Sequence, residues 1–589
     1  MIAVAAPASD GVYLSPLVVA ARGETLYVAD ATAHRVAVVN TKKERVLRAF
    51  ALDAAPSGVA VSPDGKRLYV TIGTADGRAL VLNARTGKVQ GELKTGHSPN
   101  SPVVSPDGKT LFVCNQFSND VSGFDLKTRS EACRVPVTRE PVAAAITPDG
   151  NRLIVANLLP HGRADSGYVA ASVDVIDTNA QRVRASIALP NGSTDLRGVC
   201  VSPDGAYAYV THILSRYLLP TTQLERGWVN TNAVSVIDID TLALLNTVLL
   251  DEVDMGAANP WGVTCSPDGT RLLVAHAGSH EISIIDRGRL HRKLEEAAAR
   301  GEADTVPNDL AFLVGLRERC RLKGKGPRGI AADDTRVFAA EYYSGSLGIV
   351  NLERQSSRIV RSLALGPAPE PDVVRSGEML FHDADFCFQR WQSCASCHPG
   401  GARVDALNWD MLNDGLGTPK NTKSLLLSHQ TPPAMATGVR ETAEVAVRAG
   451  IRNSLFNTLD ESYAVKLDEY LKSLKPVPSP MLVNGALSPA AERGKQVFDA
   501  AKCSRCHPAP LFTDMKSHDV GTGTPGQGSG KFDTPTLVEV WRTAPYLHDG
   551  RAASMFDVIK THNTGDKHGT VSGLTQQEID DLVAYVLSL

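Results

Sequence analysis

The first 366 residues repeat one pattern of hydrophobic and polar positions seven times. A short apolar run leads into a polar turn, Ser/Thr-Pro-Asp-Gly, and a second run with alternating β-branched residues follows. Proline presets the backbone of such a turn and glycine accepts the positive φ, so each copy predicts two strands joined by a tight turn. Five copies carry the full turn and two are weaker; they begin at Ser62, Ser105, Thr147, Ser202 and Ser266, and at Arg22 and Ala332.

The spacing of these copies indicates the architecture. Successive turns lie roughly 40 to 66 residues apart, and a period near 40 with about four short strands is typical of a β-propeller blade. The longer spacings indicate loops inserted at 161–170, 215–230 and 287–305, and we expect a helix in the last. The pattern therefore predicts an all-β, seven-bladed propeller over residues 1–366.

The β pattern ends at a proline-rich segment, GPAPEPD at 366–372, and amphipathic helices follow it. Ser488 and the pair Thr575/Glu578 are typical N-terminal caps of such helices. A second break, LKPVPSP at 474–480, divides this region into two halves of similar layout. We therefore predict two mainly α-helical domains after the propeller, 367–480 and 481–589.

Each half contains one Cys-x-x-Cys-His motif, formed by Cys394, Cys397 and His398, and by Cys503, Cys506 and His507. Two thiols at this spacing reach the two vinyl groups of one porphyrin, and the adjoining imidazole binds the iron. A structural zinc site needs two ligand pairs around one ion, and a redox dithiol lies on a βαβ unit; the sequence has neither pattern. We expect two covalent c-type haems with His398 and His507 as proximal ligands.

Composition excludes other classes of protein. A length of 589 residues requires several cores, and a net charge of −3 gives no electrostatic footprint for binding nucleic acid. No apolar run approaches the roughly 18 residues of a membrane-spanning helix. The cysteines outside the two motifs are scattered, which does not indicate a disulfide scaffold; one of them, Cys387, is expected in the helix that approaches the first motif.

The N-terminal sequence, MIAVAAPASDG, has neither a basic segment nor a full apolar core, so it does not predict an intact signal peptide. In bacteria, c-type haem is attached outside the cytoplasm. We therefore expect a periplasmic, cell-surface or extracellular protein whose signal peptide has been removed.

One set of propeller residues has metal-binding chemistry. The residue that ends the second strand of each repeat should fall on one ring, and four adjacent blades would then present Asp30, His212, His276 and Glu341 together. Imidazole and carboxylate suit a first-row transition metal. The alternative is that these residues form hydrogen bonds at strand ends or face the next domain.

Residues 12–366 resemble the YVTN-type seven-bladed β-propellers, which implies a fold and no particular activity. Residues 373–589 resemble the bacterial di-haem cytochrome c peroxidase/MauG family in the haem motifs and in KNTKSLL (420–426), LFTDMKSHDVGTG (511–523) and TAPYLHDG (543–550). That resemblance implies that the first haem is the site of peroxide or oxygen chemistry and the second a six-coordinate electron relay. It also implies a calcium ion between the haems, bound by the side chain of Asn421 and the carbonyl oxygens of Thr543 and Pro545.

The relay haem needs a sixth ligand. Matching the family outward from His548-Asp549-Gly550 places His562 at that position, with Met555 and His568 as alternatives. Two imidazoles would give a lower potential than a histidine and a methionine, because thioether sulfur favours ferrous iron. The plainer interpretation of His562 is a surface histidine.

The sequence departs from the family around the first haem. Ala436 stands where peroxidases of this family have a tryptophan, and no acid or base is identifiable between Val445 and Phe456 to move a proton between the peroxide oxygens. Trp391 and Trp409 could relay electrons or simply pack on the porphyrin. The distal ligand stays open between His429, Met435, Asn413 and a vacant position.

Two function classes follow. The first is an exported di-haem oxidoreductase that reacts with peroxide at the first haem, with a redox partner protein or a protein or small-molecule substrate. The second is a non-catalytic electron-transfer cytochrome whose propeller docks a partner. A third, with a propeller metal as the catalytic centre and the haems as its electron path, is the weakest.

Overall fold

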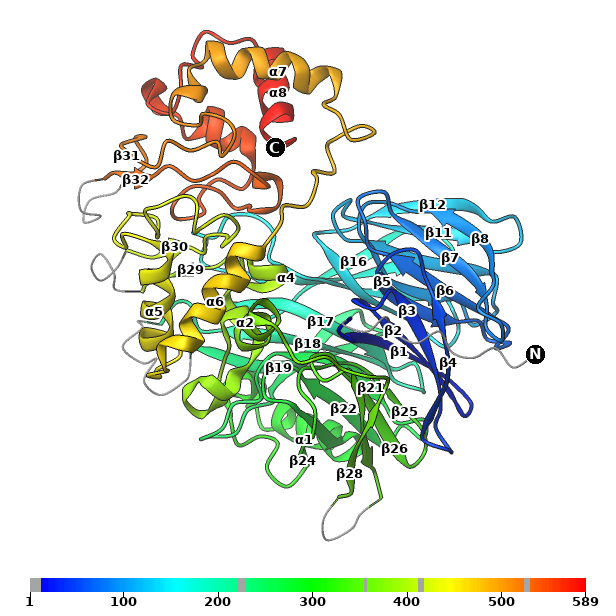
Figure 1. Ribbon diagram of the computed structural model, residues 1–589. Coiled ribbons are helices and arrows are strands. Elements are labelled where there is room, and N and C mark those ends of the chain that lie inside the picture. The colour runs from blue at the N-terminus through cyan, green and yellow to red at the C-terminus, as the bar shows by residue number, and fades with distance from the viewer. Residues whose placement is uncertain (1–11, 220–228, 354–357, 412–417, 524–529) are drawn as a thin grey trace.

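The computed structural model describes residues 12–219, 229–353, 358–411, 418–523 and 530–589. The first part is a ring of seven antiparallel four-stranded sheets, and each blade is built from four consecutive strands in chain order (Figure 1). This confirms the seven-bladed propeller that the repeat pattern predicts.

The first four blades hold β1 Pro16–Arg22, β2 Thr25–Asp30, β3 Arg35–Asn40, β4 Arg45–Ala51; β5 Pro56–Val61, β6 Arg67–Ile72, β7 Arg78–Asn83, β8 Val89–Lys94; β9 Pro99–Val104, β10 Thr110–Asn115, β11 Asp120–Asp125, β12 Ser130–Pro136; β13 Pro141–Ile146, β14 Arg152–Asn157, β15 Ser172–Asp177, β16 Arg182–Ala188. The last three hold β17 Ser193–Val201, β18 Tyr207–Ser215, β19 Asn230–Asp238, β20 Ala243–Leu249; β21 Pro260–Cys265, β22 Arg271–His276, β23 Glu281–Asp286, β24 Arg317–Arg321; β25 Pro327–Ala332, β26 Arg336–Glu341, β27 Ser346–Asn351, β28 Val360–Ala364.

The repeated turn joins the first two strands of a blade by local hydrogen bonds. In the second blade the Ser62 hydroxyl donates to Asp64 Oδ1 at 2.6 Å and accepts from the Arg67 amide at 3.0 Å, and Gly65 takes φ = +71°. The other four full copies make the same serine- or threonine-to-aspartate contact. The hydrogen bonds that define this turn therefore lie within its own sequence.

Side-chain packing and a few hydrogen bonds, such as the one from Arg336 to the Thr41 carbonyl oxygen, close the ring. The innermost strand of the last blade, β25, lies against β1 of the first, and a Cβ on Gly329 would come within 2.6 Å of the Leu17 carbonyl oxygen. A buried cluster that includes Leu14, Val19, Phe338 and Leu347 fills the space between these two blades. The first and last blades therefore meet like any other neighbours, with no exchanged strand.

The helical part follows the propeller and lies on one side and end of it (Figure 1). Its helices are α2 Val373–His382, α3 Cys394–Cys397, α4 Pro399–Ala402, α5 Ala443–Asn453, α6 Glu461–Ser473, α7 Pro489–Ala500 and α8 Gln576–Val586; its short strands pair as β29 Asn408–Trp409 with β30 Lys420–Asn421, and β31 Ser517–His518 with β32 Phe532–Asp533. The helix expected within 287–305 is α1 Arg287–Ala299. The caps at Ser488 and at Thr575/Glu578 are also present.

The two helical halves use the same close helix crossing. In the first, Gly377 of α2 lies against the backbone of α6 at Lys466; in the second, Gly494 of α7 lies against the backbone of α8 at Asp581. A Cβ at either glycine would overlap a carbonyl oxygen of the facing helix. The shared crossing explains why the two halves look alike in sequence.

Replacing Gly494 with alanine is expected to lower the free energy of unfolding by about 1–3 kcal/mol, because the added methyl group has no room against Asp581. Chemical denaturation of the haem-loaded protein measures this. Gly288→Ala in α1 is the control, since the nearest atom to its new Cβ lies 3.8 Å away, and helix propensity there favours alanine. An equal loss in both variants would contradict the close crossing.

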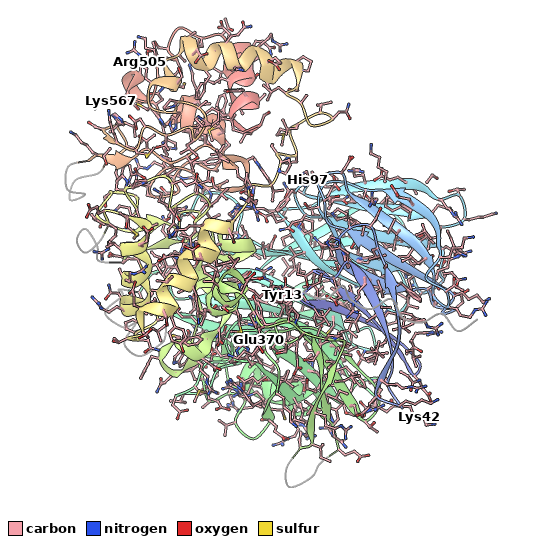
Figure 2. All side chains as sticks on the ribbon, viewed as in Figure 1. Tyr13, Lys42, His97, Glu370, Arg505 and Lys567 are labelled. Atoms are coloured by element: carbon pink, nitrogen blue, oxygen red, sulfur yellow. The ribbon has the colours of Figure 1, made fainter. Side chains whose placement is uncertain are left out.

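The two proline-rich linkers, 366–372 and 474–480, each form a hydrogen bond with the propeller part of the chain. The hydroxyl of Tyr13 donates to the carbonyl oxygen of Glu370 at 3.2 Å and accepts from the Asp372 amide at 2.7 Å, in the first proline-rich segment (Figure 2). His97 Nε2 lies 2.9 Å from the carbonyl oxygen of Pro478 in the second, and its ring lies 6.2 Å from that of Trp541. Both segments therefore run along the propeller. No helix in the described residues has the length and apolar character needed to cross a lipid bilayer.

Candidate di-haem site

Both Cys-x-x-Cys-His motifs open into one cavity of about 1040 Å³ between the two helical halves. Its wall includes the cysteines and histidine of each motif, from Cys394 to His398 and from Cys503 to His507. The volume exceeds that of a typical pocket for a single small ligand, which is about 300–1000 Å³. The sequence therefore brings the two predicted attachment sites to a shared interior.

The propeller holds the first motif in place. Asn259 of the propeller accepts hydrogen bonds through its side-chain oxygen from Ser393 at 3.0 Å and Ser396 at 3.2 Å, the two serines that cap α3. Asn230 of β19 donates to Cys397 Sγ at 3.3 Å, and Asn232 donates to the Trp391 carbonyl oxygen at 3.2 Å. No local sequence signal marks these contacts, because they join segments more than 130 residues apart.

The two histidines predicted to be proximal ligands make equivalent hydrogen bonds, each to a backbone carbonyl oxygen of its own half. His398 Nδ1 lies 3.1 Å from the carbonyl oxygen of Arg403, and His507 Nδ1 lies 2.8 Å from that of Phe512, in each case five residues further on. Only a protonated Nδ1 can donate to a carbonyl, so Nε2 of each ring carries the lone pair that a metal needs. Burial lowers the pKa of His398 to about 4 and also lowers the pKa of His507, so both rings are neutral.

Across the cavity from His507 lies His568. The two ring centroids are 6.4 Å apart. A metal–imidazole bond is about 2.0 Å and a ring nitrogen lies roughly 1.1 Å from its centroid, so two imidazoles on one iron have centroids roughly 6 Å apart. Burial, and then the neighbouring His507, lower the pKa of His568 to about 4, which leaves it neutral. The geometry therefore suits two axial imidazoles on one haem iron.

A local loop carries His568 to this position. The side chain of Asn563 donates to the carbonyl oxygens of His568 at 3.1 Å and Gly569 at 2.9 Å, and accepts from the His568 amide at 2.8 Å. Gly569 takes φ = +88°, and a Cβ there would lie 3.5 Å from Cys503 Sγ. The loop therefore lies directly over the second motif.

His562, the ligand expected from the sequence, is not among the residues that line the cavity. It ends the helix η7 (Asp557–Thr561), where its amide donates to the Asp557 carbonyl oxygen at 2.8 Å. Met555, the other alternative, lines the cavity from the buried core of the second half. The structure therefore brings His568 and not His562 to face His507.

The cysteine chemistry fits thioether attachment. Burial raises the pKa of Cys394 to about 12 and that of Cys503 to about 11, so neither is the thiolate of a redox-active cysteine at neutral pH. The described residues contain two groups of three potential metal ligands, Cys506/Asp514/His518 and His280/Asp383/Asp385. Neither contains both cysteines of a motif, so the zinc alternative has no ligand set here.

The predicted calcium residues line the same cavity. Asn421 of β30, Thr543 and Pro545 are all in its wall, and a Cβ built on Gly550 would lie within 3.1 Å of atoms of both Asn421 and Pro545. The backbone N–H of Asn421 donates to the His548 carbonyl oxygen at 2.7 Å. The side-chain nitrogen of Asn421, Nδ2, is buried without a hydrogen-bond partner. Side-chain amide nitrogen and oxygen are interchangeable in assignment, so the same position can present an oxygen to a cation. The residues therefore fit the expected ion.

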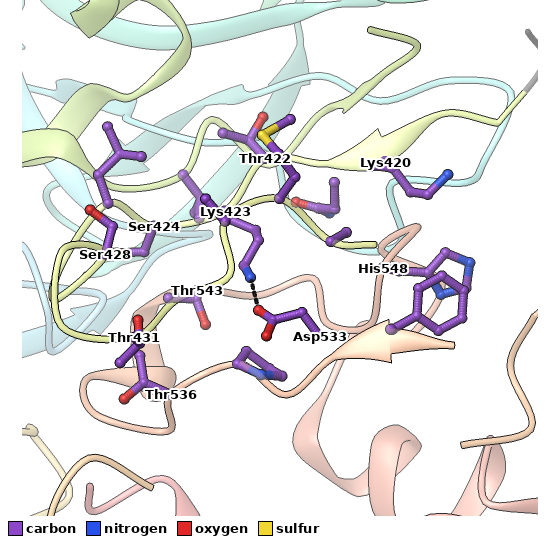
Figure 3. A pocket seen from close by; sticks show the side chains of 18 of the residues that line it. Lys420, Thr422, Lys423, Ser424, Ser428, Thr431, Asp533, Thr536, Thr543 and His548 are labelled. Carbon is purple, nitrogen blue, oxygen red and sulfur yellow. Dashed lines mark hydrogen bonds and ion pairs between the residues drawn. The ribbon is translucent and has the colours of Figure 1, made fainter. Parts of the chain in front are cut away.

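The wall between the two motifs contains one close ion pair. Lys423 Nζ and Asp533 Oδ2 are 2.6 Å apart, and the pair joins the first half to the second (Figure 3). The Asp533 amide also donates to the Ala436 carbonyl oxygen at 2.9 Å. Ala436 lines the cavity at this junction, so no aromatic side chain stands at the position where the family has a tryptophan.

Helix α5 lines the shared cavity mostly with small and apolar residues. They include Ala443, Ala446, Val447 and Gly450, and the one polar residue that α5 adds, Asn453, carries a neutral amide that is neither an acid nor a base. Met435 also lines the cavity, but His429 does not; its Nε2 is held 3.0 Å from Asp468 Oδ1. Asn413 lies outside the described residues.

The cysteine and tryptophans before and after the first motif are buried. Cys387 and Trp391 pack with Leu455 and Cys394, whereas Trp409 packs in a cluster with Leu407, Cys397 and three propeller residues. The predicted burial of Cys387 is confirmed, although it lies in a short turn between η3 (Ala384–Phe386) and η4 (Phe388–Arg390) and not in α2.

The structure does not bring the four propeller-ring residues together as a metal site. Each bonds inside its own blade: His212 and His276 to Ser235 and Ser283 at 2.8 Å, Glu341 to Ser346, and Asp30 to Arg35. None of them belongs to either group of potential ligands found in the described residues. The position links the second and third strands of a blade, which is the structural alternative that the sequence left open.

One buried carboxylate joins the two halves, and sequence reasoning missed it. Glu539, just before the TAPYLHDG segment, accepts from Arg403 Nε at 3.0 Å and Nη2 at 2.6 Å, and from Arg542 Nη1 at 3.0 Å. Arg542 also donates to the Gly400 carbonyl oxygen at 3.1 Å. Since the Arg403 carbonyl holds His398, this network connects the second half to the first proximal histidine. No motif marks such a contact.

Comparison with known proteins places the chain. The family model described as Cytochrome c matches residues 491–589. Hydrazine synthase subunit gamma of Kuenenia stuttgartiensis is 31% identical over 274 residues, which cover 37% of this chain and 78% of that protein. The chain therefore belongs to the same family of di-haem cytochromes as this subunit.

One more relative and one solved structure also resemble this chain. The methylamine utilization protein MauG of Methylorubrum extorquens is 25% identical over 290 residues, 37% of this chain and 78% of MauG. A solved structure of Kuenenia stuttgartiensis hydrazine synthase matches with a TM-score of 0.54 and 25% identity, over 60% of this chain and 99% of that one. The propeller cytochrome is thus an oxidoreductase with haem c cofactors, as the sequence predicts.

Proposed function

We propose that this di-haem cytochrome is an exported enzyme in which the first haem reacts with peroxide and the second passes electrons between that haem and a redox partner protein. The observation that carries the proposal is an asymmetry between the two motifs. His507 faces His568 across the cavity, whereas no ring contact of this kind places a second imidazole opposite His398 among the described residues. A six-coordinate haem exchanges electrons, and an open one binds a small molecule.

The protein's own groups prepare the first haem for that role. The iron of a bound haem supplies the electrons that a peroxide bond accepts. His398 would bind that iron through Nε2, since the Arg403 carbonyl fixes its ring, and Asn259 fixes the serines around the cysteines. The small and apolar residues of α5 line the same cavity. Asn421, Thr543 and Pro545 would hold calcium between the haems.

The alternative is a cytochrome that transfers electrons without catalysis. The apolar face of α5 favours it, because peroxide cleavage is faster with a group that moves a proton. In that case Met435, which lines the same cavity, is the residue available to bind the first iron.

The absorption spectrum of the diferric protein before and after addition of hydrogen peroxide distinguishes these functions. A high-spin charge-transfer band that disappears with peroxide supports the enzyme. Two low-spin haems that do not respond support the electron-transfer cytochrome and overturn the proposal. Hydrazine is a useful second probe, because one relative is a subunit of hydrazine synthase.

Removing the calcium ligand gives a separate test. Asn421→Ala is expected to reduce the calcium content of the purified protein from one ion per chain to none, because its side chain is the amide that faces the site. Elemental analysis after exhaustive dialysis measures this. Asn457→Ala is the control, since its side chain bonds the Phe386 carbonyl oxygen. A calcium content unchanged by Asn421→Ala would contradict the assignment.

A further inference from the structure

Trp409 and Asp405 form a hydrogen-bonded pair beside the first motif. The indole Nε1 of Trp409 donates to Asp405 Oδ2 at 2.8 Å, and the other carboxylate oxygen accepts from the Leu407 amide at 3.0 Å. Trp409 lines the di-haem cavity and packs with Cys397, the second attachment cysteine. The pair therefore stands between the first haem position and the propeller.

The pair is shielded from water by the propeller. Trp409 is 6% exposed and Asp405 is fully buried. Val169 and Tyr217, from the loops inserted in the fourth and fifth blades, pack on Trp409, and Thr194 of β17 donates to the Asp405 carbonyl oxygen at 2.9 Å. The same two insertions lengthen the repeat spacing, and here they cover Trp409 with apolar side chains.

Asp405 is well placed to accept a proton. No ion pair between Asp405 and a lysine or arginine occurs in the described residues, and the carboxylate is stabilised only by neutral donors. Burial raises its pKa to about 6, so the protonated and ionised forms lie close in free energy at neutral pH. A tryptophan whose N–H points at such a group loses an electron more easily, because the proton can leave along the hydrogen bond.

The second tryptophan beside this motif, Trp391, does not donate its N–H to a carboxylate. Trp391 is 1% exposed and also packs near an attachment cysteine, Cys394. Its Nε1 donates at 3.3 Å to the side-chain amide of Gln389, which cannot take up a proton at neutral pH. The chain thus contains a matched pair of buried indoles that differ in their acceptor.

We propose that Trp409 is a redox-active residue that supplies one electron to peroxide reduction at the first haem while its indole proton passes to Asp405. The inference rests on the proposed function and deepens it. It also accounts for Ala436: the aromatic electron donor of this chain stands beside the first motif instead of between the haems.

The electrons and atoms balance as follows. Hydrogen peroxide takes up two electrons and two protons and leaves as two water molecules. Trp409 provides one electron, its N–H bond breaks, and Asp405 holds the proton, which leaves a neutral tryptophanyl radical. The haem centre provides the other electron, and the two protons come from solvent.

Rapid freeze-quench EPR after one equivalent of hydrogen peroxide tests this in the full haem-loaded protein. The expected result is a radical whose hyperfine pattern changes on labelling with ring-deuterated tryptophan. Trp409→Phe should reduce its yield at least tenfold, and Trp391→Phe should leave it unchanged. Asp405→Asn keeps an acceptor but no base, so the radical should be lost or appear as the protonated cation.

The outcomes separate the inference from the function. Peroxide that changes the haem spectrum but gives no radical, or a radical that survives Trp409→Phe, overturns the inference and leaves the function standing. If peroxide does not react, the function fails, and one-electron oxidation by a photoexcited ruthenium complex then tests the pair directly. Oxidation that does not form the radical at Trp409 in preference to Trp391 also overturns the inference.

Discussion

Replacing His568 with alanine is expected to convert the second haem from low spin to high spin. His568 is the imidazole that faces His507 at 6.4 Å between ring centroids, so its loss leaves one axial position of the iron open. The reduction potential should rise as well, because the second imidazole no longer stabilises the ferric state. Absorption and EPR spectra of the purified ferric protein measure the spin state, and a redox titration measures the potential.

His562→Ala is the matched control, since it removes a histidine only six positions away that does not line the cavity. Its spectrum should equal that of the unchanged protein. A second haem that stays low spin in His568→Ala and becomes high spin in His562→Ala would restore the assignment that the sequence suggested.

Replacing Glu539 with alanine is expected to lower the free energy of unfolding by about 4 kcal/mol. Removing one partner of a buried ion pair typically costs about 3–5 kcal/mol, because the other charge stays buried without compensation. Here Arg403, whose side chain is 5% exposed, loses its carboxylate partner, and Arg542, 6% exposed, keeps only the more distant Glu140 at 3.8 Å. Chemical denaturation of the haem-loaded protein, followed by fluorescence, measures the loss.

The same variant should disturb the first haem more than the second, because the Arg403 carbonyl orients His398. Glu461→Ala provides the comparison: Glu461 is 67% exposed and pairs with Arg448 at the surface, where such pairs contribute about 0–1 kcal/mol. If Glu539→Ala costs no more than Glu461→Ala, the network does not stabilise the contact between the halves.

Local chemistry made most of the architecture predictable. The serine-to-aspartate contact at Ser62 and the positive φ of Gly65 lie within one turn, so the sequence alone specifies that hairpin. The haem motifs are equally local, because two thiols and an imidazole lie within five residues. The resemblance of residues 373–589 to the di-haem family also made it possible to predict that the two helical halves pair.

What the sequence could not predict depends on contacts between distant segments. Counting residues beyond His548 led to His562, but η7 and the loop tied by Asn563 bring His568 over the motif instead. The predicted metal site in the propeller is not formed, for a related reason. His212 and His276 do lie at equivalent strand ends, but each already has a hydrogen bond to a serine of the neighbouring strand. The partners of Arg403 and Trp409 likewise appear only when the chain is folded.

Every blade is completed by its own four consecutive strands, and the ring closes without an exchanged strand. A gene segment encoding the whole ring can therefore be joined to a cytochrome gene, or removed from it, without leaving any sheet half built. After such a fusion, selection has to shape the contacts between the two parts, from strand residues such as Asn230 to loops such as the one whose Ala164 amide donates to the Gly550 carbonyl oxygen at 2.9 Å. Recombination followed by refinement of those contacts is thus a short evolutionary route to this protein.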